Sequence, residues 1–355
     1  MGSDAIARPA LDWLAGEGSG VAQVVGVFTQ PDRASGRGQQ VQPNAIKRWA
    51  QARRLPVHQP ERMDADALAQ LAALRPDVTL VMAYGRLLRQ AFIDTPRLGT
   101  LNLHTSLLPK YRGASPIQTA VSCGERETGV TLMRMVLALD AGPVGDLERV
   151  SVAPLDTAAD VEDKLARACP PLLARALPRL AAGSLKFTPQ DEAQVTFCRR
   201  LAKADGGLDF AAPAAALAVR INGLFPWPGC QTELNGQPVK LGLADAVEAA
   251  AEPAGACSLL DCKPAAADGV EPDGKCHVLY DTSAPPGTVV GTDADGLLVA
   301  TGRGLLRLRR LQRPGGKMLP AADFLRGFPV AAGTVLASHP MPPLAGPEPF
   351  PRAKG

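Results

Sequence analysis

Three side chains of this chain are of the kinds used in acyl transfer: the amide of Asn102, the imidazole of His104 and the carboxylate of Asp140. If Thr100 to His104 ends a strand, Asn102 and His104 occupy alternate positions and point to the same face. Asp140 is followed by Ala141 and Gly142, which places its carboxylate in a turn. Should the three converge, the imidazole could take a proton from an attacking amine. The carboxylate would fix the tautomer, and the amide would donate to a developing oxyanion.

This spacing does not exclude the simpler interpretation that all three are polar residues with structural roles. The chain has no serine or cysteine in a nucleophile-elbow pattern such as GxSxG. If the site is catalytic, we therefore expect direct attack by one substrate on the other, without a covalent intermediate on the protein.

The elements around these residues predict an α/β domain over residues 1–197. Apolar strands at Val21–Thr29, Asp77–Ala83 and Thr100–His104 alternate with helices at Pro43–Arg53 and Asp64–Leu74. This alternation is typical of a doubly wound, mostly parallel, Rossmann-like sheet, whose ligand lies at the carboxyl ends of the strands. The GxGxxG phosphate fingerprint is absent after these strands, which argues against a nicotinamide dinucleotide enzyme.

The pattern changes near residue 198. We predict a linker over 198–212, followed by a small OB-like β-barrel over 213–338, because short strands with glycine-rich turns follow one another there. Asn235-Gly236 between two apolar runs is typical of a hairpin. Residues 244–286 are expected to form an inserted surface loop, and the proline-rich residues 339–355 a flexible tail.

The net charge of +3 is too small to indicate a polyanionic partner by itself. Two local concentrations of positive charge are more informative. A glycine-rich loop, Gln30–Gln40, carries Arg33 and Arg37, and the run from Gly302 to Lys317 contains six cations and no acidic residue. Such a run is either a solvated face or a surface that meets a nucleic-acid backbone.

The seven cysteines are scattered and form no CxxC pair, which predicts reduced thiols in the cytoplasm. Cys257, Cys262, Cys276 and His277 lack zinc-finger spacing, so no metal site is expected. No apolar run approaches the roughly 18 residues needed to span a membrane.

Several motifs together resemble the folate-dependent formyltransferases. They are Asn102-Leu-His104, Ser106-Leu-Leu-Pro109, Arg112-Gly-Ala-Ser-Pro-Ile-Gln118, Thr128-Gly-Val-Thr131 and Leu139-Asp-Ala-Gly142. Further similarity at Thr29–Arg33, Gly36–Gly38, Phe225–Gly229 and Ala321–Leu325 extends the resemblance over most of the chain. The basic loop and the C-terminal domain are features of the branch of this family that acts on tRNA.

The resemblance implies transfer of formyl from 10-formyltetrahydrofolate to the α-amino group of methionine on initiator tRNA, by a monomer without a metal. Asn102 would polarise the formyl oxygen, His104 would handle the amine proton or stabilise the tetrahedral intermediate, and Asp140 would orient His104. Four residues would line the folate site: Ser106, Leu107, Leu108 and Pro109. Six cations would contact the tRNA: Arg33, Arg37, Arg307, Arg309, Arg310 and Lys317.

The sequence departs from the family at its beginning. The family has a β-strand before the stretch that corresponds to Met1-Gly2-Ser3, so we expect that strand to be missing and the true start to lie upstream. Because of the insertion 244–286, the resemblance does not predict which residues of that region contact the tRNA.

Three other functions fit parts of the pattern. A 10-formyltetrahydrofolate hydrolase would use the same three residues with water as the acceptor. A formyltransferase acting on a small amine, such as a glycinamide ribonucleotide or an amino sugar, would need neither the basic loop nor the C-terminal domain. An inert tRNA-binding protein would need no catalytic side chain at all.

Overall fold

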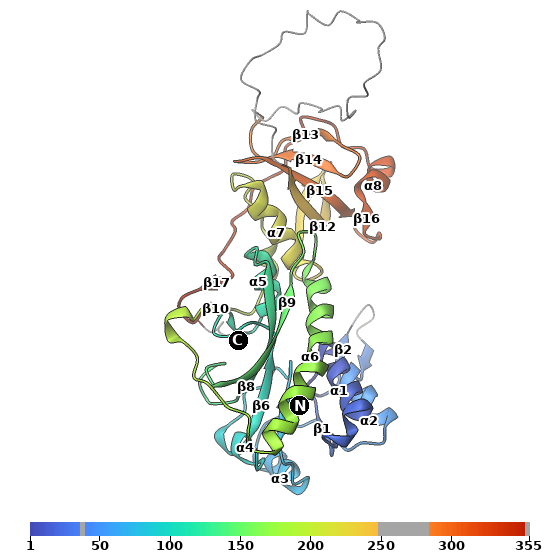
Figure 1. The fold of residues 1–355 in the computed structure, drawn as a ribbon. Coiled ribbons are helices and arrows are strands. Elements are labelled where there is room, and N and C mark those ends of the chain that lie inside the picture. Colours follow the sequence, from blue (N-terminus) through green and yellow to red (C-terminus); the bar gives the residue numbers. More distant parts are fainter. Residues whose placement is uncertain (36–39, 248–283, 352–355) are drawn as a thin grey trace, which may run out of the picture. The chain divides into compact units, whose positions relative to one another are not determined.

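The computed structural model describes residues 1–35, 40–247 and 284–351 (Figure 1). The chain divides into two compact units. Unit 1 comprises Met1–Gly206, Asn222–Gly229 and Pro342–Gly355, and unit 2 comprises Gly207–Ile221 and Cys230–Met341.

The strands of unit 1 form mixed sheets and not a mostly parallel one. In the four-stranded sheet β5-β6-β8-β9, β5 runs parallel to β6, whereas β8 is antiparallel to both of its neighbours. Two further pairs, β1 with β4 and β7 with β10, are parallel. The strands are β1 (Val27–Phe28), β2 (Arg33–Ser35), β3 (Gln40–Gln42), β4 (Val57–His58), β5 (Thr79–Val81), β6 (Thr100–His104), β7 (Arg112–Gly113), β8 (Glu127–Arg134), β9 (Val144–Ser151), β10 (Phe197–Cys198) and β17 (Ala345–Gly346).

Helices cover both faces of these sheets, as a doubly wound arrangement requires. One core joins Leu101 and Leu103 of β6 to residues of α1, α2 and α6, and a second joins Phe28 and Val81 to residues of α3 and α4. The helices of unit 1 are α1 (Arg8–Ala15), α2 (Ala45–Ala52), α3 (Ala65–Ala73), α4 (Gln90–Asp94), α5 (Pro116–Ser122) and α6 (Ala158–Ala181).

Residues 1–3 lie between β1 and β5. The Gly2 amide donates to the Phe28 carbonyl and the Met82 amide donates to the Met1 carbonyl, each over 3.0 Å. Beside them is a cavity of about 150 Å³, lined by apolar side chains that include Leu14, Val27, Leu71 and Leu80. The two strand pairs are thus bridged by main-chain hydrogen bonds at one end and separated by an apolar cavity at the other.

The long helix α6 is continuous, although its sequence suggests a break at Pro170-Pro171. Thr157 begins it with a capping box that includes Asp160. Its buried face, which includes Leu165 and Leu172, packs on the sheet of unit 1. Burial of about 1.5 to 3 kcal/mol per large apolar side chain, summed over that face, offsets a cost of roughly 3 kcal/mol for each of the three prolines inside the helix.

Unit 2 contains an antiparallel sheet of order β11-β12-β15-β14-β13, with β16 paired to β15. The expectation of a closed barrel is not confirmed. The outer edge of β13 is instead met by residues 333–336, since Val289 donates to the Thr334 carbonyl and Gly333 donates to the Val289 carbonyl. The elements are α7 (Ala214–Leu224), β11 (Cys230–Leu234), β12 (Gln237–Val247), β13 (Val289–Thr292), β14 (Leu297–Ala300), β15 (Leu305–Gln312), β16 (Leu319–Pro320) and α8 (Ala321–Gly327).

Of the expected flexible tail, residues 339–341 belong to unit 2 and residues 342–351 to unit 1, where they include a strand. Ala345 and Gly346 form β17, which pairs antiparallel with β10. Leu344 is buried, and Ala345 packs against Tyr111. The prolines of this segment suggested disorder, but a short strand that completes an existing sheet edge gains main-chain hydrogen bonds that composition does not reveal.

Candidate active site

Asn102 and His104 lie on one face of β6, as the strand period predicts. Leu101 and Leu103 point into the core shared with α6. The residues that alternate with them therefore face the other way. His104 is 6% exposed and lies opposite Thr131 of β8, and Asn102 lies opposite Met133. Within the described ranges the side-chain amide of Asn102 makes no hydrogen bond.

Asp140 reaches His104 from the turn between β8 and β9. Its Oδ2 lies 3.7 Å from His104 Nδ1 and accepts a hydrogen bond of 2.9 Å from the main-chain amide of Gly113. Asp140 has a φ of +48°, in the left-handed region that non-glycine residues rarely adopt. The structure thus brings this carboxylate and the imidazole together.

The Asp140 turn is held by Gln190, a residue that sequence reasoning missed. Gln190 Nε2 donates to the carbonyls of Asp140 and Gly142, both over 2.8 Å. Its Oε1 accepts from Arg112 Nη2 over 2.9 Å. Arg112 is only 4% exposed and also pairs with Glu192, and the hydrogen bond from Arg112 lowers the pKa of the Glu192 carboxyl. Nothing in the sequence around Gln190 signals this role, because the contacts join segments about 50 and 78 positions apart.

A second missed residue is Tyr111. His104 Nε2 lies 2.9 Å from the Tyr111 main-chain carbonyl oxygen. Tyr111 lies between two of the motifs, Ser106–Pro109 and Arg112–Gln118, but a hydrogen bond to its main-chain carbonyl does not depend on the residue type.

The loop expected to line the folate site follows β6 directly. Ser106 is fully buried, and its hydroxyl donates to the Lys110 carbonyl over 2.6 Å. Thr131 Oγ1 donates to the Ser106 carbonyl over 2.7 Å and accepts from the Leu108 amide over 3.2 Å. Ser106 and Leu108 therefore hold the loop in shape, whereas Leu107 and Pro109 are only partly buried and remain accessible to a ligand.

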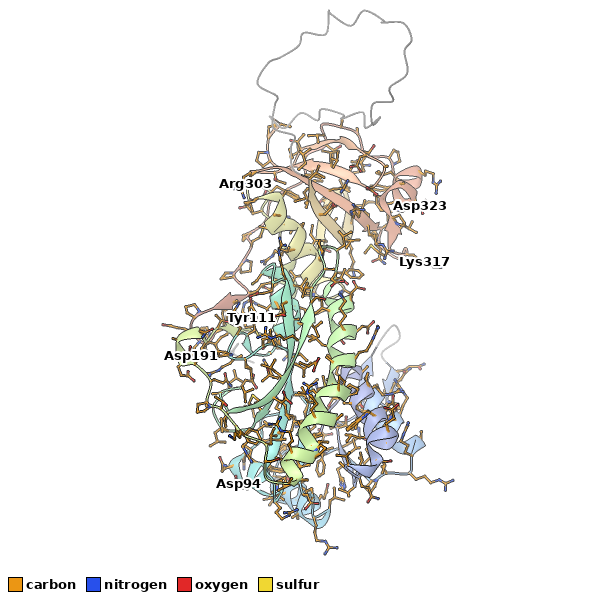
Figure 2. All side chains as sticks on the ribbon, viewed as in Figure 1. Asp94, Tyr111, Asp191, Arg303, Lys317 and Asp323 are labelled. Carbon is orange, nitrogen blue, oxygen red and sulfur yellow. The ribbon has the colours of Figure 1, made fainter. Side chains whose placement is uncertain are left out.

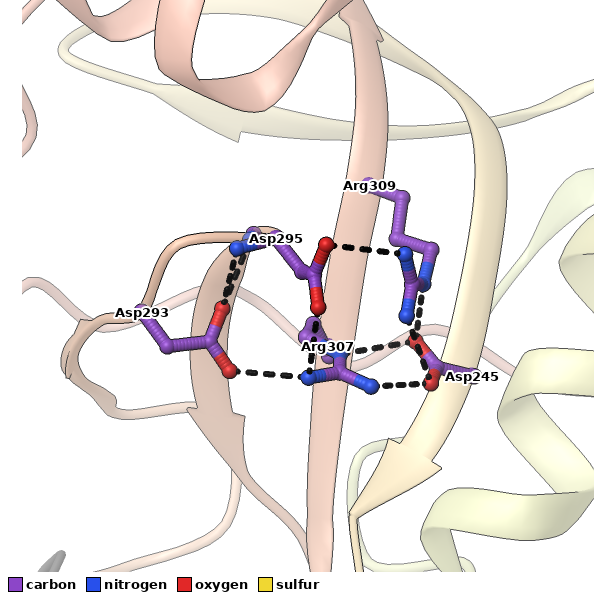
Figure 3. Close-up of polar contacts among 6 residues, drawn as sticks. Asp245, Asp293, Asp295, Arg307 and Arg309 are labelled. Carbon is purple, nitrogen blue, oxygen red and sulfur yellow. Dashed lines mark hydrogen bonds and ion pairs between the residues drawn. The ribbon is translucent and has the colours of Figure 1, made fainter. Parts of the chain in front are cut away.

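Two arginines predicted to bind tRNA are instead bound by aspartates of the same unit (Figure 3). Arg307 pairs with Asp245 over 2.5 Å and with Asp293 over 2.9 Å. Arg309 pairs with Asp245 over 2.7 Å and with Asp295 over 3.4 Å. Because each carboxylate lies on a neighbouring strand or turn, the run Gly302–Lys317 looks free of acidic residues only along the sequence.

These ion pairs change the ionisation of the groups that make them. Burial acts to raise the pKa of Asp245, but the hydrogen bonds from Arg307 and Arg309 outweigh it and the pKa lies below its usual value. The bond to Asp245 in turn raises the pKa of Arg307. Arg307 and Arg309 are thus neutralised in place.

Other predicted cations remain exposed. Arg310 and Lys317 are exposed, and Figure 2 shows Lys317 on the outside of unit 2. Lys240 of β12 is exposed on the strand next to β15. Arg33 is exposed in the β2–β3 hairpin of unit 1, and Arg37 lies outside the described residues.

Among the described residues, no group of three or more His, Cys, Asp or Glu side chains is placed to hold a metal ion. The four candidate ligands between Cys257 and His277 lie outside those residues. No helix in the part of the chain that the structure describes is long and apolar enough to cross a membrane.

Comparison with known proteins identifies the family. Residues 2–177 match the formyl transferase family, and residues 200–329 match the formyl transferase C-terminal domain. The chain belongs to the formyltransferase family. Curated relatives of this formyltransferase include the methionyl-tRNA formyltransferase of Ectopseudomonas mendocina, 41% identical over 85% of this chain and 86% of that protein. The methionyl-tRNA formyltransferase of Acidovorax ebreus is 39% identical over 96% of this chain and 98% of that protein.

Solved structures of lower identity share the fold of this formyltransferase. An N-formyltransferase from Helicobacter canadensis, solved with folinic acid and dTDP-3-aminofucose, superposes with a TM-score of 0.58 at 15% identity, covering 86% of this chain and 96% of that one. HypX from Aquifex aeolicus, solved with tetrahydrofolic acid, superposes with a TM-score of 0.51 at 18% identity, covering 78% of this chain and 43% of that one.

Proposed function

We propose that this formyltransferase moves the formyl group of 10-formyltetrahydrofolate to the α-amino group of methionyl initiator tRNA. The observation that carries this proposal is the meeting of His104 and Asp140 beside Asn102, in a chain that is 39–41% identical to methionyl-tRNA formyltransferases over most of its length. The fold neighbours that were solved with tetrahydrofolic acid and with folinic acid support a folate-derived donor.

The reaction needs three things from the protein, and each has a candidate. The Asn102 amide donates to the formyl oxygen and stabilises the negative charge that develops there during attack. The His104 imidazole takes the proton that the amine must lose as its nitrogen bonds to the formyl carbon. When the bond to the folate nitrogen breaks, the same imidazolium returns a proton to that nitrogen, so the protein ends in its starting state.

Asp140 stabilises the imidazolium between these two steps. Its Oδ2 lies 3.7 Å from Nδ1, so a negative charge faces the ring nitrogen. Leu107 and Pro109, the partly buried members of the loop after β6, are placed to contact the donor, while Ser106 and Leu108 keep that loop in position.

The tRNA surface that we propose differs from the set expected from sequence. Arg310 and Lys317 of unit 2 and Arg33 of unit 1 are retained as phosphate contacts, and exposed Lys240 is added. Arg307 and Arg309 are removed because Asp245, Asp293 and Asp295 already neutralise them. Since one chain supplies Asn102, His104 and Asp140, we propose a monomer that works without a metal in the cytoplasm, where translation begins.

The acceptor is tested by following release of tetrahydrofolate from 10-formyltetrahydrofolate with the full chain. We expect release to depend on methionyl initiator tRNA, with little release in buffer alone or with an amino sugar nucleotide. Release without any acceptor would support the hydrolase, and release with only the small amine would support that transferase. Tight tRNA binding without release would support the inert binder.

A further inference from the structure

We propose that Tyr111 is a positioning residue of the active site: its main-chain carbonyl fixes the tautomer of His104 and makes Nδ1, beside Asp140, the nitrogen that accepts the substrate proton. This inference rests on the proposed function, because it describes how the same imidazole is prepared for that reaction. The sequence motifs of the family and the ion pairs in the structure indicate only one partner for the His104 ring, the side chain of Asp140.

The direction of one hydrogen bond determines which nitrogen of His104 carries the hydrogen. His104 Nε2 lies 2.9 Å from the Tyr111 carbonyl oxygen. A carbonyl oxygen can only accept, so Nε2 must carry the hydrogen and donate it. In the neutral ring the other nitrogen, Nδ1, is then the bare base.

The bare nitrogen points toward Asp140. Nδ1 faces Asp140 Oδ2 at 3.7 Å, which is too far for a hydrogen bond but places the negative charge of the carboxylate beside this nitrogen. A proton that arrives at Nδ1 is therefore stabilised by the carboxylate. When the ring is neutral, Nδ1 carries no hydrogen and cannot donate a hydrogen bond to Asp140. Asp140 Oδ2 accepts a hydrogen bond from the Gly113 amide instead.

Tyr111 is held in the conformation that this arrangement requires. Its φ of +61° lies in the left-handed region, which a tyrosine adopts only when its surroundings impose it. The Tyr111 amide donates to Thr196 Oγ1 over 2.9 Å, and the phenol donates to Glu125 Oε1 over 2.7 Å. The ring packs with Ala120, Cys198 and Ala345.

The hydrogen bonds and packing contacts that hold Tyr111 come from different segments of the chain. Loss of any one of them should therefore leave the direction of the Tyr111 carbonyl unchanged. Glu125 is itself paired with Lys110 Nζ over 2.9 Å. Burial, followed by the bond to Glu125, raises the pKa of the Tyr111 phenol, so the hydroxyl stays protonated and remains a donor. Figure 2 labels Tyr111 within unit 1.

The direct test reads the tautomer of His104 by ¹⁵N NMR of the full chain without substrates. The chain has four histidines, so the His104 signals are assigned by comparison with His104→Gln. At a pH where the ring is neutral, we expect Nε2 to give the protonated, pyrrole-type shift and Nδ1 the bare, pyridine-type shift. The reverse pattern, or an even mixture of the two, would overturn the proposal whatever the activity of the protein.

A second measurement tests whether the hydrogen bonds that hold Tyr111 affect kcat. Tyr111→Phe keeps the packed ring but removes the bond to Glu125, and Thr196→Val removes the acceptor of the Tyr111 amide. In the double variant we expect the second tautomer to appear and kcat to fall about tenfold, while KM for donor and acceptor stays nearly constant. Tyr84→Phe is the matched control, because it removes a buried phenol that contacts Met63 in a different core.

The conservative variant at Glu125 completes the design. Glu125→Gln keeps an oxygen that can accept from the Tyr111 phenol, whereas Glu125→Ala does not. With Thr196→Val also present, we expect the Gln variant to retain the wild-type tautomer and kcat, and the Ala variant to resemble the Tyr111→Phe, Thr196→Val double variant. If the double variant keeps a pure wild-type tautomer and also loses kcat, Tyr111 acts by some other route and the proposal fails.

Discussion

The main-chain amide of Gly113 donates a hydrogen bond of 2.9 Å to Asp140 Oδ2, across 27 positions of the chain. This bond ties β7 to the turn after β8, which carries Asp140. It fixes the carboxylate beside His104 before any substrate binds. A site prepared in this way needs little rearrangement during the reaction.

The charge of Asp140 should matter more than its shape. Asp140→Asn can still accept from Gly113 but no longer stabilises a proton on His104. We expect kcat to fall about 100-fold with little change in KM or thermal stability. Asp77→Asn is the control, because Asp77 is an exposed residue paired with Arg97 on the surface. Equal activity of the Asp140 and Asp77 variants would contradict the role given to Asp140.

Gln190 should support both the stability of the folded protein and binding of the formyl donor. Gln190→Ala removes two donors from the Asp140 turn and one acceptor from the buried Arg112. Loss of such buried partners costs about 1 to 3 kcal/mol, which thermal or urea unfolding can measure. We also expect a lower kcat/KM, because the turn is free to leave its strained conformation. A variant as stable and as active as wild type would show that the Gln190 contacts do not hold the turn.

The network of Asp245 with Arg307 and Arg309 should make unit 2 sensitive to acid. The pKa of Asp245 is lowered in the folded protein, so the unfolded state takes up the proton first as the pH falls. The stabilisation is therefore complete well above about pH 4, the usual aspartate value, and is lost as the pH falls through the lower folded value. The difference in free energy of unfolding between wild type and Asp245→Asn should shrink over that range. A difference that stays constant down to pH 3 would contradict the assignment.

Arg310 and Arg309 are neighbours in sequence that should differ in tRNA binding. Arg310→Ala and Lys317→Ala should each weaken binding and reduce the slope of log affinity against log salt by about one phosphate contact. Arg309→Ala should leave that slope unchanged and lower the stability of unit 2, because its guanidinium is already paired with Asp245. Filter binding at several salt concentrations would measure this. A slope that is reduced equally in the Arg309 and Arg310 variants would place both arginines on the RNA surface.

Local sequence patterns predicted much of the site. The placing of Asn102 and His104 on one face follows from the strand period alone, and the α/β class follows from the alternation of elements. The sequence could not give the partners that tertiary folding supplies. Asp245 lies 62 positions before Arg307 and becomes its cross-strand neighbour only in the folded sheet.

Hydrogen bonds made by main-chain groups are the second kind of contact that the sequence could not predict. The Tyr111 carbonyl, the Gly113 amide and the Asp140 carbonyl all take part in the site, yet a peptide group is the same for every residue type. The continuity of α6 through Pro170-Pro171 and the strand at Ala345–Gly346 were missed for a related reason. Local propensity there is overridden by burial and by an available sheet edge.

The central claim is tested most directly by transfer of labelled formyl from 10-formyltetrahydrofolate to methionyl initiator tRNA, with the full chain and His104→Ala compared in single turnover. We predict labelled N-formylmethionyl-tRNA with the full chain and a rate lower by roughly 100-fold or more with the variant. A folded full chain that transfers no label, or a variant that transfers it at the wild-type rate, would contradict the account.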